Sequence, residues 1–464
     1  MAKPKLLIVV LFQNLAPART YYARMPAPPL SGLLLAGLTP DIVEVEVLHE
    51  MVRPINYDTD ADFVALSFMD FCTPHAINVA TEFRKRGKKV VAGGRYATTH
   101  PDRVAPYFDA TVVGEADWIW ASVVEDLVSG RLKNIYQAAP AASLEGIPTP
   151  RYDLAEPEFA APVVTEATRG CPFTCSFCQL NIQRRPYRTR PIEDVVADLA
   201  AASSLPWHRR QVAMFYDNNF GGDMVYAKEL LRAIAHFDFA GVGFQFSFNC
   251  LRDDEFVDLL QQANGIMAFV GLESLQQESL DGVSKRQNRV ADYHDQFAKL
   301  AQRGIMSFTG MMVALEEDTP EYYETLPARL REVDPSAVLL SISIPIPGTP
   351  FHRELAAQNR IFDDDLRHYE GDHLVFEPRH VNRQQVLAAL ESINREFYSW
   401  REILARGARL LTRHMAANWT SLRGWQHTIV LAVLFLKVSW FQRHHALEKV
   451  FNTPDRGRST ALEA

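Results

Sequence analysis

The sequence predicts an α/β protein with two successive strand–helix series followed by a helical region. Three observations predict this class. Short apolar runs alternate with amphipathic stretches over residues 1–136 and again over 161–358, a proline-rich stretch separates the two series, and only helical patterns remain over 359–464. Alternating strands and helices are typical of parallel sheets whose faces are covered by helices.

The first series, residues 1–136, predicts a doubly wound parallel sheet. Its opening run KLLIVVLF is continuously apolar, as expected of a strand that is buried on both faces. The predicted strands are 5–12, 43–49, 62–68, 89–92 and 110–113, with helices over 76–86 and 119–128. The turn-rich segments VAGGRYATTHPD and VVGEAD follow two of these strands, at the edge where such sheets bind ligands.

The second series predicts an open, partial (β/α)6 barrel over residues 161–358. Four prolines and little periodicity mark residues 137–160 as a linker in front of it. Ile192, Val195, Val196 and Leu199 have the spacing of a core-facing helix. The predicted strands are 162–168, 211–217, 242–248, 266–271, 306–313 and 337–344. Barrels of this kind carry their chemistry at the carboxyl ends of their strands.

The helical C-terminal region, residues 359–464, contains one strongly apolar run, TIVLAVLFLKVSWF, from Thr428 to Phe441. A membrane span needs about 20 apolar residues, so a span is the least favoured of three interpretations. The others are a buried core helix and an interfacial helix that makes a peripheral contact with the inner face of the membrane. The interfacial interpretation is favoured by Arg443, His444, His445 and Lys449, and by the aromatic residues Trp419, Trp425 and Trp440.

Composition and cysteine usage limit the class of protein further. The 464 residues are 47% hydrophobic and 22% charged, with a formal net charge of −8, which disfavours a nucleic-acid partner. The start of the chain lacks a small-residue cleavage site, so we expect a cytoplasmic protein. Cys72 and Cys250 are isolated and are expected to be small buried hydrophobic side chains.

The remaining three cysteines form the motif TRGCPFTCSFCQL. Cys171, Cys175 and Cys178 have the spacing C-x-x-x-C-x-x-C and follow a predicted strand. Thiolates suit an iron–sulfur cluster or zinc, but a structural zinc site takes four protein ligands and the sequence offers no fourth cysteine nearby. Three thiolates on a 4Fe-4S cluster would leave one iron open to a ligand. A zinc site or an inert thiol group is the alternative.

This motif closely resembles the signature of the radical S-adenosylmethionine (SAM) superfamily. The resemblance implies that the open iron binds the methionyl group of SAM and that the reduced cluster cleaves SAM to a 5′-deoxyadenosyl radical. It also implies SAM contacts in three further segments. They are Asp217, Asn218 and Asn219 in YDNNF, Glu273 and Ser274 in VGLES, and Pro347 and Gly348 in PIPGTP.

The implied roles of these segments differ. YDNNF would contact the methionyl amino group, although the family's common version is glycine-rich with a glutamate. VGLES would bind the ribose hydroxyls, as acidic residues do in other nucleotide sites. PIPGTP would bring backbone close to the adenine. A solvated strand-end acid and a plain turn are the alternatives for the last two.

The order of the two series resembles the cobalamin-binding subgroup of this superfamily, in which a Rossmann-like domain precedes the barrel. The resemblance implies that Gly93 and Gly94 admit a large flat ligand, with Thr98, Thr99 and His100 lining the same cleft. Members of the subgroup that ligate cobalt through a histidine carry the motif D-x-H-x-x-G after the first strand. This sequence departs from them, because its loop there reads FQNLAPART and contains no histidine. His75 or His100 would then ligate cobalt, or no protein group would. A domain that has lost the cofactor is the alternative.

The leading hypothesis is a cobalamin-dependent radical SAM methyltransferase acting on an unactivated carbon of a hydrophobic biosynthetic intermediate. A flavodoxin- or ferredoxin-type protein would supply the electron. The second hypothesis is an oxidative or ring-forming radical SAM enzyme acting on a tetrapyrrole-like or isoprenoid scaffold. A third, from another class, is a non-catalytic iron–sulfur sensor.

Overall fold

The computed structural model describes residues 3–12, 27–140, 143–183, 186–418 and 422–451, and the side chains of 416–423 and 444–451 lie outside this description. The chain forms two compact units. Residues 1–167 and 188–214 form the first unit, and residues 168–187 and 215–464 form the second. The predicted linker, residues 137–160, thus belongs to the first unit, and the predicted C-terminal region belongs to the second.

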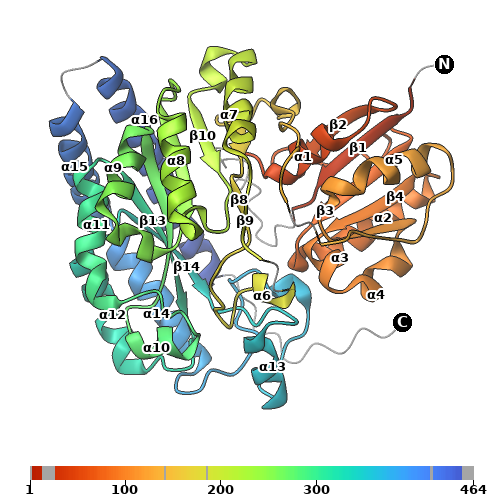
Figure 1. Ribbon diagram of the computed structural model, residues 1–464. Coiled ribbons are helices and arrows are strands. Elements are labelled where there is room, and N and C mark those ends of the chain that lie inside the picture. The colour runs from red at the N-terminus through yellow and green to blue at the C-terminus, as the bar shows by residue number, and fades with distance from the viewer. Residues whose placement is uncertain (1–2, 13–26, 141–142, 184–185, 419–421, 452–464) are drawn as a thin grey trace. The chain divides into compact units, whose positions relative to one another are not determined.

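The first unit contains a six-stranded sheet of order β2-β1-β3-β4-β5-β6 (Figure 1). All of its strand pairs are parallel, which is the predicted doubly wound architecture. The strands are β1 (Lys5–Val10), β2 (Glu44–His49), β3 (Phe63–Phe68), β4 (Lys89–Gly94), β5 (Ala110–Val113) and β6 (Ile135–Gln137). The short strand β6 was not predicted, because three residues with exposed ends carry no apolar run.

Amphipathic helices supply the apolar side chains that pack on this sheet. In α2, Ala76, Val79, Ala80 and Phe83 are buried at the spacing of one helix face. The main helices beside this sheet are α1 (Leu30–Leu38), α2 (Thr73–Lys85), α3 (Arg95–Thr99), α4 (Pro101–Val104) and α5 (Trp120–Val128). Helix α7 (Ile192–Ala201) belongs to the same unit but packs against β7 (Val163–Thr165) of the second sheet. The strand order places a topological switch point between β1 and β3, where parallel sheets of this kind bind ligands.

The segment 137–160 packs on the first sheet. Glu156 is buried, and its two carboxylate oxygens accept hydrogen bonds from the backbone N–H and the ring Nδ1 of His49, each at 2.6 Å. Phe159 packs edge-on against the same imidazole, with ring centroids 5.2 Å apart. Buried partners of this kind fix the segment against the end of β2, so it is not a free linker.

The second six-stranded sheet has the order β14-β13-β12-β11-β10-β7. Pairing from β11 to β14 is parallel throughout, as predicted for a partial barrel. The strands are β7 (Val163–Thr165), β10 (Val212–Phe215), β11 (Gly241–Phe246), β12 (Gly265–Glu273), β13 (Met306–Val313) and β14 (Ala337–Ile342), and the cysteine loop lies between two short strands, β8 (Thr168–Arg169) and β9 (Arg188–Thr189). All six predicted strands are confirmed to within three residues at each end.

In the second unit, helices follow the strands from β10 to β14. Their buried faces meet aromatic side chains such as Phe248, which packs edge-on against Tyr293 at 4.5 Å and Phe297 at 5.3 Å. The α-helices of this part of the unit are α6 (Leu180–Gln183), α8 (Met224–Ile234), α9 (Asp254–Gln262), α10 (Gln277–Gly282), α11 (Tyr293–Gln302), α12 (Pro320–Val333) and α13 (Pro350–Ala357).

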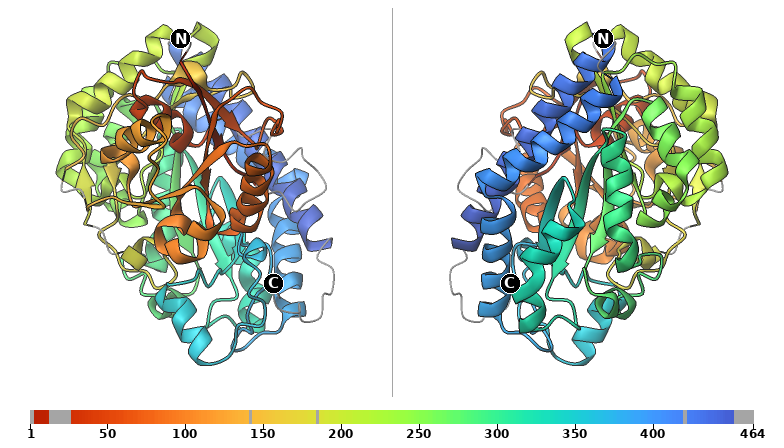
Figure 2. Two further views of the ribbon diagram at one scale, coloured as in Figure 1. Left: turned by 90° about the vertical axis from the view of Figure 1, so that its right-hand side faces the viewer. Right: turned by 90° about the vertical axis from the view of Figure 1, so that its left-hand side faces the viewer.

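Three long helices complete the second unit and confirm the helical C-terminal region. They are α14 (Arg383–Phe397), α15 (Trp400–Asn418) and α16 (Leu422–Phe451). Figure 2 shows them running beside one another along the outside of the second unit. Gly407 of α15 lies against the ring of Phe435, so close that an added Cβ would be 2.8 Å from it. The absence of a side chain there lets the two helices approach.

Candidate cluster and cofactor site

The cysteine loop is fixed by backbone hydrogen bonds to two other segments of the second unit. Ser176 donates its N–H to the carbonyl of Val283 at 2.9 Å and accepts one from Phe351 at 3.1 Å. Within the loop, the N–H of Cys178 donates to the carbonyl of Cys175 at 3.0 Å. These bonds set the directions of the thiols before any ligand binds.

The aromatic residue before the last cysteine anchors the loop by packing. Phe177 lies against a buried apolar cluster formed by Val283, Met312 and Leu315. The ammonium group of Lys285 lies 6.0 Å from the centroid of the same ring. The aromatic position of the motif therefore serves both as an apolar anchor and as one wall beside a buried cation.

The thiols lie in a partly dry environment with N–H donors beside them. Burial raises the pKa of Cys171 and raises that of Cys178 to about 11. The amide Nδ2 of Asn219 donates to Sγ of Cys171 at 3.7 Å, and Nε2 of Gln287 donates to Sγ of Cys175 at 3.6 Å. Donors of this kind stabilise thiolates and tune iron–sulfur clusters.

The donor set fits a cluster better than a single metal ion. Within the described ranges, no three histidine, cysteine or acidic side chains converge on one point as ligands of one ion would. In a 4Fe-4S cluster each thiolate binds a different iron, so the sulfurs need not converge. Three soft thiolates with amide donors beside them fit such a cluster. They do not fit a structural zinc site, which takes four protein ligands around one ion.

The segment after β10 brings polar side chains to the cysteine loop. Asp217 is buried and accepts a hydrogen bond from the hydroxyl of Thr168 at 2.6 Å. Asn219 is also buried, and its side-chain oxygen accepts the N–H of Ser247 at 2.9 Å while its amide faces Cys171. Asn218, between them, is exposed. Of the three residues of this segment that were predicted to contact SAM, Asn218 is exposed, and the other two are buried.

Glu273 occupies a strained position at the end of β12. Its φ is 66°, a left-handed conformation that costs a non-glycine residue free energy, and the β12–β13 register shifts between Gly271 and Glu273. The buried amide of Asn288 donates to the carbonyls of Gly271 and Leu272, at 2.8 and 3.3 Å, and so satisfies backbone groups at this irregularity. Strain held in place by the surrounding structure is typical of functional sites.

Glu273 forms a buried ion pair. Nζ of Lys285 lies 2.7 Å from Oε1 of Glu273, and both side chains are nearly excluded from solvent. Burial lowers the pKa of Lys285, but Glu273 and the thiols of Cys175 and Cys178 outweigh that effect, so the net shift is upward. Lys285 therefore remains a cation beside the cysteine loop, held there by the predicted ribose-binding acid.

Ser274 faces the protein interior. Its hydroxyl is within 3.1 Å of the Tyr322 hydroxyl and accepts the N–H of Gln276 at 3.1 Å. Beneath it, buried Asp318 accepts hydrogen bonds from Ser279 and Tyr323, and burial still raises the pKa of Asp318 to about 6. This network supports the loop that carries Glu273, and the ribose contact that the resemblance implied for Ser274 stays a prediction.

The predicted adenine-side loop lies next to the cysteine loop. Gly348 has φ of 91° and packs against Ile182 of α6, which comes shortly after Cys178, the last cysteine of the motif. Pro347 precedes it, partly exposed, and Thr349 caps α13 by accepting the N–H of His352 at 3.2 Å. The structure thus brings the segments around Asn219, Glu273 and Gly348 to the same cysteine loop.

In the first unit, the predicted cofactor residues follow β4. Gly94 has φ of 109°, and a Cβ there would clash with the carbonyl of Phe68. Gly93 differs, because an added Cβ would meet nothing closer than the carbonyl of Leu66 at 4.0 Å. Thr98 donates to the carbonyl of Gly94 at 2.8 Å. Gly94 is therefore required for strand packing, and Gly93 faces open space.

Thr99 and the two candidate cobalt ligands have partners of their own. Thr99 donates to the carbonyl of Arg95 at 3.2 Å and lies 2.9 Å from Nδ1 of His100. Nε2 of His75 lies 2.7 Å from Oε1 of Glu50, at the carboxyl end of β2. Most of the loop FQNLAPART lies outside the described residues.

Several candidate residues were not predicted from the sequence. Lys285, Gln287 and Asn288 lie in the polar run SKRQN after α10, and that run beyond a strand end was the available signal. Asp70 follows β3 and is buried, and its Oδ1 lacks a hydrogen-bond partner within the described part of the chain. Burial raises the pKa of this carboxyl group. Cys72 and Cys250 are buried as expected.

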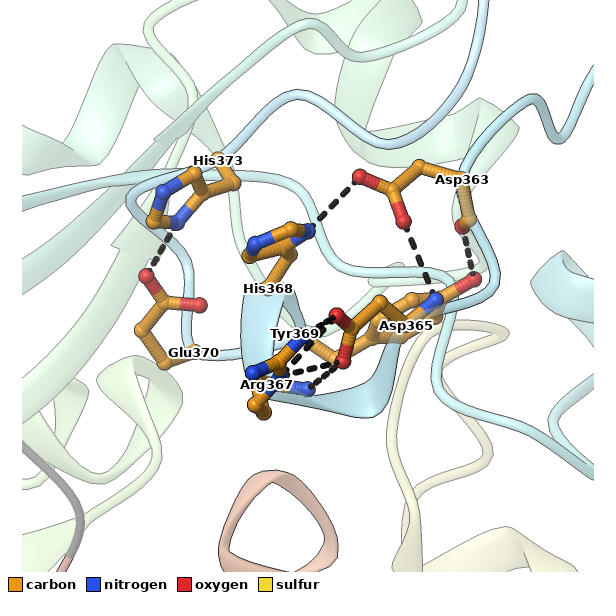
Figure 3. A network of polar contacts seen from close by, with 7 residues as sticks. All are labelled: Asp363, Asp365, Arg367, His368, Tyr369, Glu370 and His373. Atoms are coloured by element: carbon orange, nitrogen blue, oxygen red, sulfur yellow. Dashed lines mark hydrogen bonds and ion pairs between the residues drawn. The ribbon is translucent and has the colours of Figure 1, made fainter. Parts of the chain in front are cut away.

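A further polar network lies beyond β14, in the acidic and histidine-rich run DDDLRHYEGDH (Figure 3). Nδ1 of His368 lies 2.7 Å from Asp363, and Nδ1 of His373 contacts Glu370. The two imidazole rings stack with centroids 4.6 Å apart. Because the N–H of Ile342 donates to Gly371 at 2.7 Å, this network is tied to the carboxyl end of β14.

Comparison with known families identifies the part of the chain that carries the cysteine loop. Residues 165–327 match the family described as the Radical SAM superfamily. This segment is a radical SAM domain. Membership confirms the interpretation of the cysteine motif and implies that this radical SAM enzyme uses a 4Fe-4S cluster and SAM.

Similarity to curated relatives extends over most of this radical SAM chain. It is 28% identical to bacteriochlorophyllide d C-8(2)-methyltransferase of Chlorobaculum tepidum, over 80% of this chain and 86% of the relative. It is 24% identical to hopanoid C-2 methylase of Rhodopseudomonas palustris, over 75% of this chain and 68% of the relative. It is 23% identical to the anaerobic magnesium-protoporphyrin IX monomethyl ester cyclase of Rubrivivax gelatinosus, over 80% and 72%.

Two solved structures share the fold of this radical SAM protein. The cobalamin-dependent enzyme OxsB, with aqua-cobalamin and SAM bound, has a TM-score of 0.62 at 13% identity, over 97% of this chain and 78% of that one. The methyltransferase TsrM of Kitasatospora setae, with cobalamin and a [4Fe-4S] cluster bound, has a TM-score of 0.57 at 18% identity, over 77% and 75%. The predicted order of a doubly wound domain before a partial barrel is thereby confirmed.

Proposed function

We propose that this radical SAM enzyme is a cobalamin-dependent methyltransferase that acts on an unactivated carbon of a hydrophobic biosynthetic intermediate. One observation carries the proposal: the chain combines the cysteine loop with a separate parallel sheet that is open at Gly93. Methyl transfer is supported by the similarity to the bacteriochlorophyllide methyltransferase and the hopanoid methylase. Cobalamin is supported by the similarity to the solved structures of TsrM and OxsB, both of which contain it.

The chain's own contribution is to hold, orient and shield the reacting groups. When bound, the cluster, SAM and cobalamin supply a 5′-deoxyadenosyl radical and a transferable methyl group. Cys171, Cys175 and Cys178 hold the cluster, and the amides of Asn219 and Gln287 stabilise its thiolates. Packing of Phe177 against the barrel keeps water from one side of the loop.

For SAM, the proposed contacts divide between three segments. Asn218, exposed beside the cysteine loop, binds the methionyl group, with Asp217 and Asn219 orienting its loop from buried positions. Glu273 accepts hydrogen bonds from the ribose hydroxyls, in a geometry fixed by Lys285. Pro347 and Gly348 place backbone against the adenine.

For cobalamin, the residues of the first unit fit a large ligand with amide side chains. Gly93 leaves space at the end of β4, and Thr98 and Thr99 follow it on α3. Buried Asp70 has an oxygen without a partner in the described ranges, available to an amide donor of the ligand. His75, oriented by Glu50, is the residue that would ligate cobalt, with His100 as the alternative.

The proposed partners are a small hydrophobic substrate and a flavodoxin- or ferredoxin-type electron donor, in the cytoplasm. Hydrophobicity of the substrate is supported by the names of the relatives, since a bacteriochlorophyllide and a hopanoid are both largely apolar. The acidic net charge of −8 gives no support to a nucleic-acid partner.

A second candidate function is oxidative or ring-forming radical chemistry on a tetrapyrrole-like or isoprenoid scaffold. The similarity to the anaerobic cyclase of Rubrivivax gelatinosus favours it. The two candidates differ in what SAM becomes. Methyl transfer yields S-adenosylhomocysteine together with a methylated product, whereas ring formation yields 5′-deoxyadenosine without either.

The test is anaerobic reconstitution followed by quantification of iron, sulfide and cobalamin. Reduced protein is then incubated with SAM and with a bacteriochlorophyllide or a hopanoid, and the SAM products are measured. We expect four irons per chain, bound cobalamin, 5′-deoxyadenosine and S-adenosylhomocysteine. Cys175→Ala should lose the cluster and both products, and Cys72→Ala, which removes a buried thiol in the first unit, should lose neither. A cluster-free wild-type protein would refute the proposal.

A further inference from the structure

The apolar helix α16 presents a row of large hydrophobic side chains to solvent. Members of this α16 row are between 36% and 61% exposed. Their spacing of three or four residues places them on one helix face. The α16 row consists of Trp425, Ile429, Val433, Leu436 and Trp440.

The opposite face of α16 is the one that packs in the second unit. Leu431, Phe435 and Ser439 are almost fully buried, and they alternate with the α16 row along the helix. Only 28% of the apolar window Gly424–Arg443 is buried inside the protein. A core helix would therefore explain one face of this segment and leave the exposed apolar face unexplained.

Helix α15 extends the exposed apolar surface at the end near Trp440. Trp400 and Leu404, one turn apart on α15, are both exposed. The guanidinium of Arg443 lies 5.6 Å from the centroid of the Trp400 ring, which places Trp400 beside the C-terminal part of the α16 row. The surface thus spans two helices that pack on each other.

Positive charges outnumber negative ones around this surface, where Glu402, half-buried between Trp400 and Leu404 in the sequence of α15, is acidic. Between Gly424 and Arg443 the sequence contains no acidic residue, and its charged residues are Lys437 and Arg443. On α15, Arg401 and Arg413 are exposed. A second copy of this chain would bring the same cations to the interface, whereas an anionic lipid surface complements them.

The structure disfavours a membrane span for α16. Its C-terminal part is bound to neighbouring helices, because Arg443 donates to the carbonyl of Tyr398 at 2.6 Å and its own carbonyl accepts the amide of Asn394 at 3.2 Å. A span would have to break these bonds and place Lys437 in the hydrocarbon core. A helix lying in the plane of the interface keeps both the bonds and the solvated cations.

We propose that the α16 row, together with Trp400 and Leu404, docks this enzyme on the surface of an anionic phospholipid membrane. The α16 helix lies parallel to the membrane, with the row in the headgroup region and the basic residues on the phosphates. Trp425 and Trp440, near the two ends of the row, are of the type that prefers this region. The proposal does not depend on the reaction that the cluster performs.

The experiment is co-sedimentation of the full chain with vesicles of 70% phosphatidylcholine and 30% phosphatidylglycerol, and with pure phosphatidylcholine. We expect binding to the anionic vesicles that weakens in high salt. Ile429→Ser combined with Val433→Ser should reduce it by about tenfold or more. Val225→Ser, which alters an equally exposed apolar residue on α8, is the matched control and should bind as the wild type does.

Lys437→Glu tests the electrostatic contribution to vesicle binding. We expect this variant to bind the anionic vesicles more weakly and the pure phosphatidylcholine vesicles as the wild type does. Undiminished binding by the Ile429→Ser, Val433→Ser protein would overturn the proposal, as would wild-type protein that stays in the supernatant. Gel filtration without lipid tests whether a second copy of the chain covers the α16 row instead. If the wild type is a dimer and the double variant a monomer, a second copy of the chain covers the row, and the membrane proposal is wrong.

Discussion

At the residue scale, the site depends on a few side chains whose partners are far away in sequence. Asn219 reaches Sγ of Cys171 from the segment after β10, and Gln287 reaches Sγ of Cys175 from the segment after α10. Lys285 adds a buried positive charge that Glu273 holds in place. These groups stabilise negative charge on the loop, so they are expected to set the properties of the bound cluster as well as its position.

Gln287→Leu should make the reduction potential of the cluster more negative, on the order of tens of millivolts, because an N–H donor to a cluster sulfur stabilises the reduced state. The amide lies 3.6 Å from Sγ of Cys175 and would be lost. An EPR-monitored redox titration measures the shift. Gln358→Leu, at an exposed position on the far end of α13, is the control and should leave the potential unchanged.

Asp318 predicts a specific pH dependence of stability. Its folded-state pKa, about 6, lies above the ordinary value of 3.8, so the folded protein keeps a proton that the unfolded chain releases. Stability should therefore fall as pH rises from about 4 to about 6, by up to about 3 kcal/mol, and then level off.

Asp318→Asn replaces the protonated carboxyl with a neutral amide and should remove this part of the pH dependence. Urea unfolding midpoints of wild type and variant between pH 4.5 and 7.5 measure the difference. The wild type should lose stability relative to the variant as pH rises to slightly above the pKa of about 6, and the difference should then stay constant. A difference between the two proteins that is constant over the whole range would show that Asp318 does not titrate as its burial predicts.

At the element scale, backbone irregularities at strand ends create the candidate sites. The register shift at the end of β12 turns Glu273 toward Lys285, and the left-handed Gly94 at the end of β4 lets the chain pass close to Phe68. Strands of regular geometry would direct alternate side chains to the two faces of the sheet. The irregular ends instead aim side chains and open backbone at the carboxyl edge.

The two glycines of β4 should respond differently to substitution. Gly94→Ala places a Cβ against the Phe68 carbonyl at a positive φ, and it should destabilise the protein by at least about 2 kcal/mol. Gly93→Ala meets open space and should cost less than about 1 kcal/mol. Thermal unfolding of both variants beside the wild type checks this, and equal losses would contradict the assignment of different roles.

At the scale of the whole molecule, the cysteine loop belongs to the second unit but interrupts the sequence of the first unit. Residues 168–187 belong to the second unit, while the segments on either side, up to 167 and from 188 to 214, belong to the first. The two proposed cofactor sites are therefore linked covalently at more than one point of the chain. Ligand binding to one unit is expected to be measurable by its effect on that unit's unfolding.

Cobalamin should raise the unfolding temperature of the protein. A ligand present at about 100 times its dissociation constant adds about 2.7 kcal/mol to the stability of the unit that binds it. Thermal scans with and without hydroxocobalamin measure the effect. Gly93→Leu fills the open space at the end of β4 and should abolish the shift while the ligand-free midpoint changes little. An undiminished shift in this variant would exclude Gly93 from the site.

The sequence alone determined the two strand–helix series and the cysteine motif. Both are local signals, because the period of apolar residues and the spacing of three thiols are set by neighbouring positions. All the predicted strands were found, and the family match confirmed the motif. What the local pattern missed was the short strand β6 and the packing of residues 137–160 onto the first sheet.

Only the tertiary structure decided which polar side chains face the thiols and which serve as support. Sequence position treats Glu273 and Ser274 alike, yet the first pairs with a buried cation and the second supports the loop from inside. The same holds for α16, where only the packing shows that Ile429 and Val433 are exposed while Leu431 and Phe435 are buried. Side-chain direction, burial and distant partners depend on how elements pack, and that information is not contained in any single stretch of the chain.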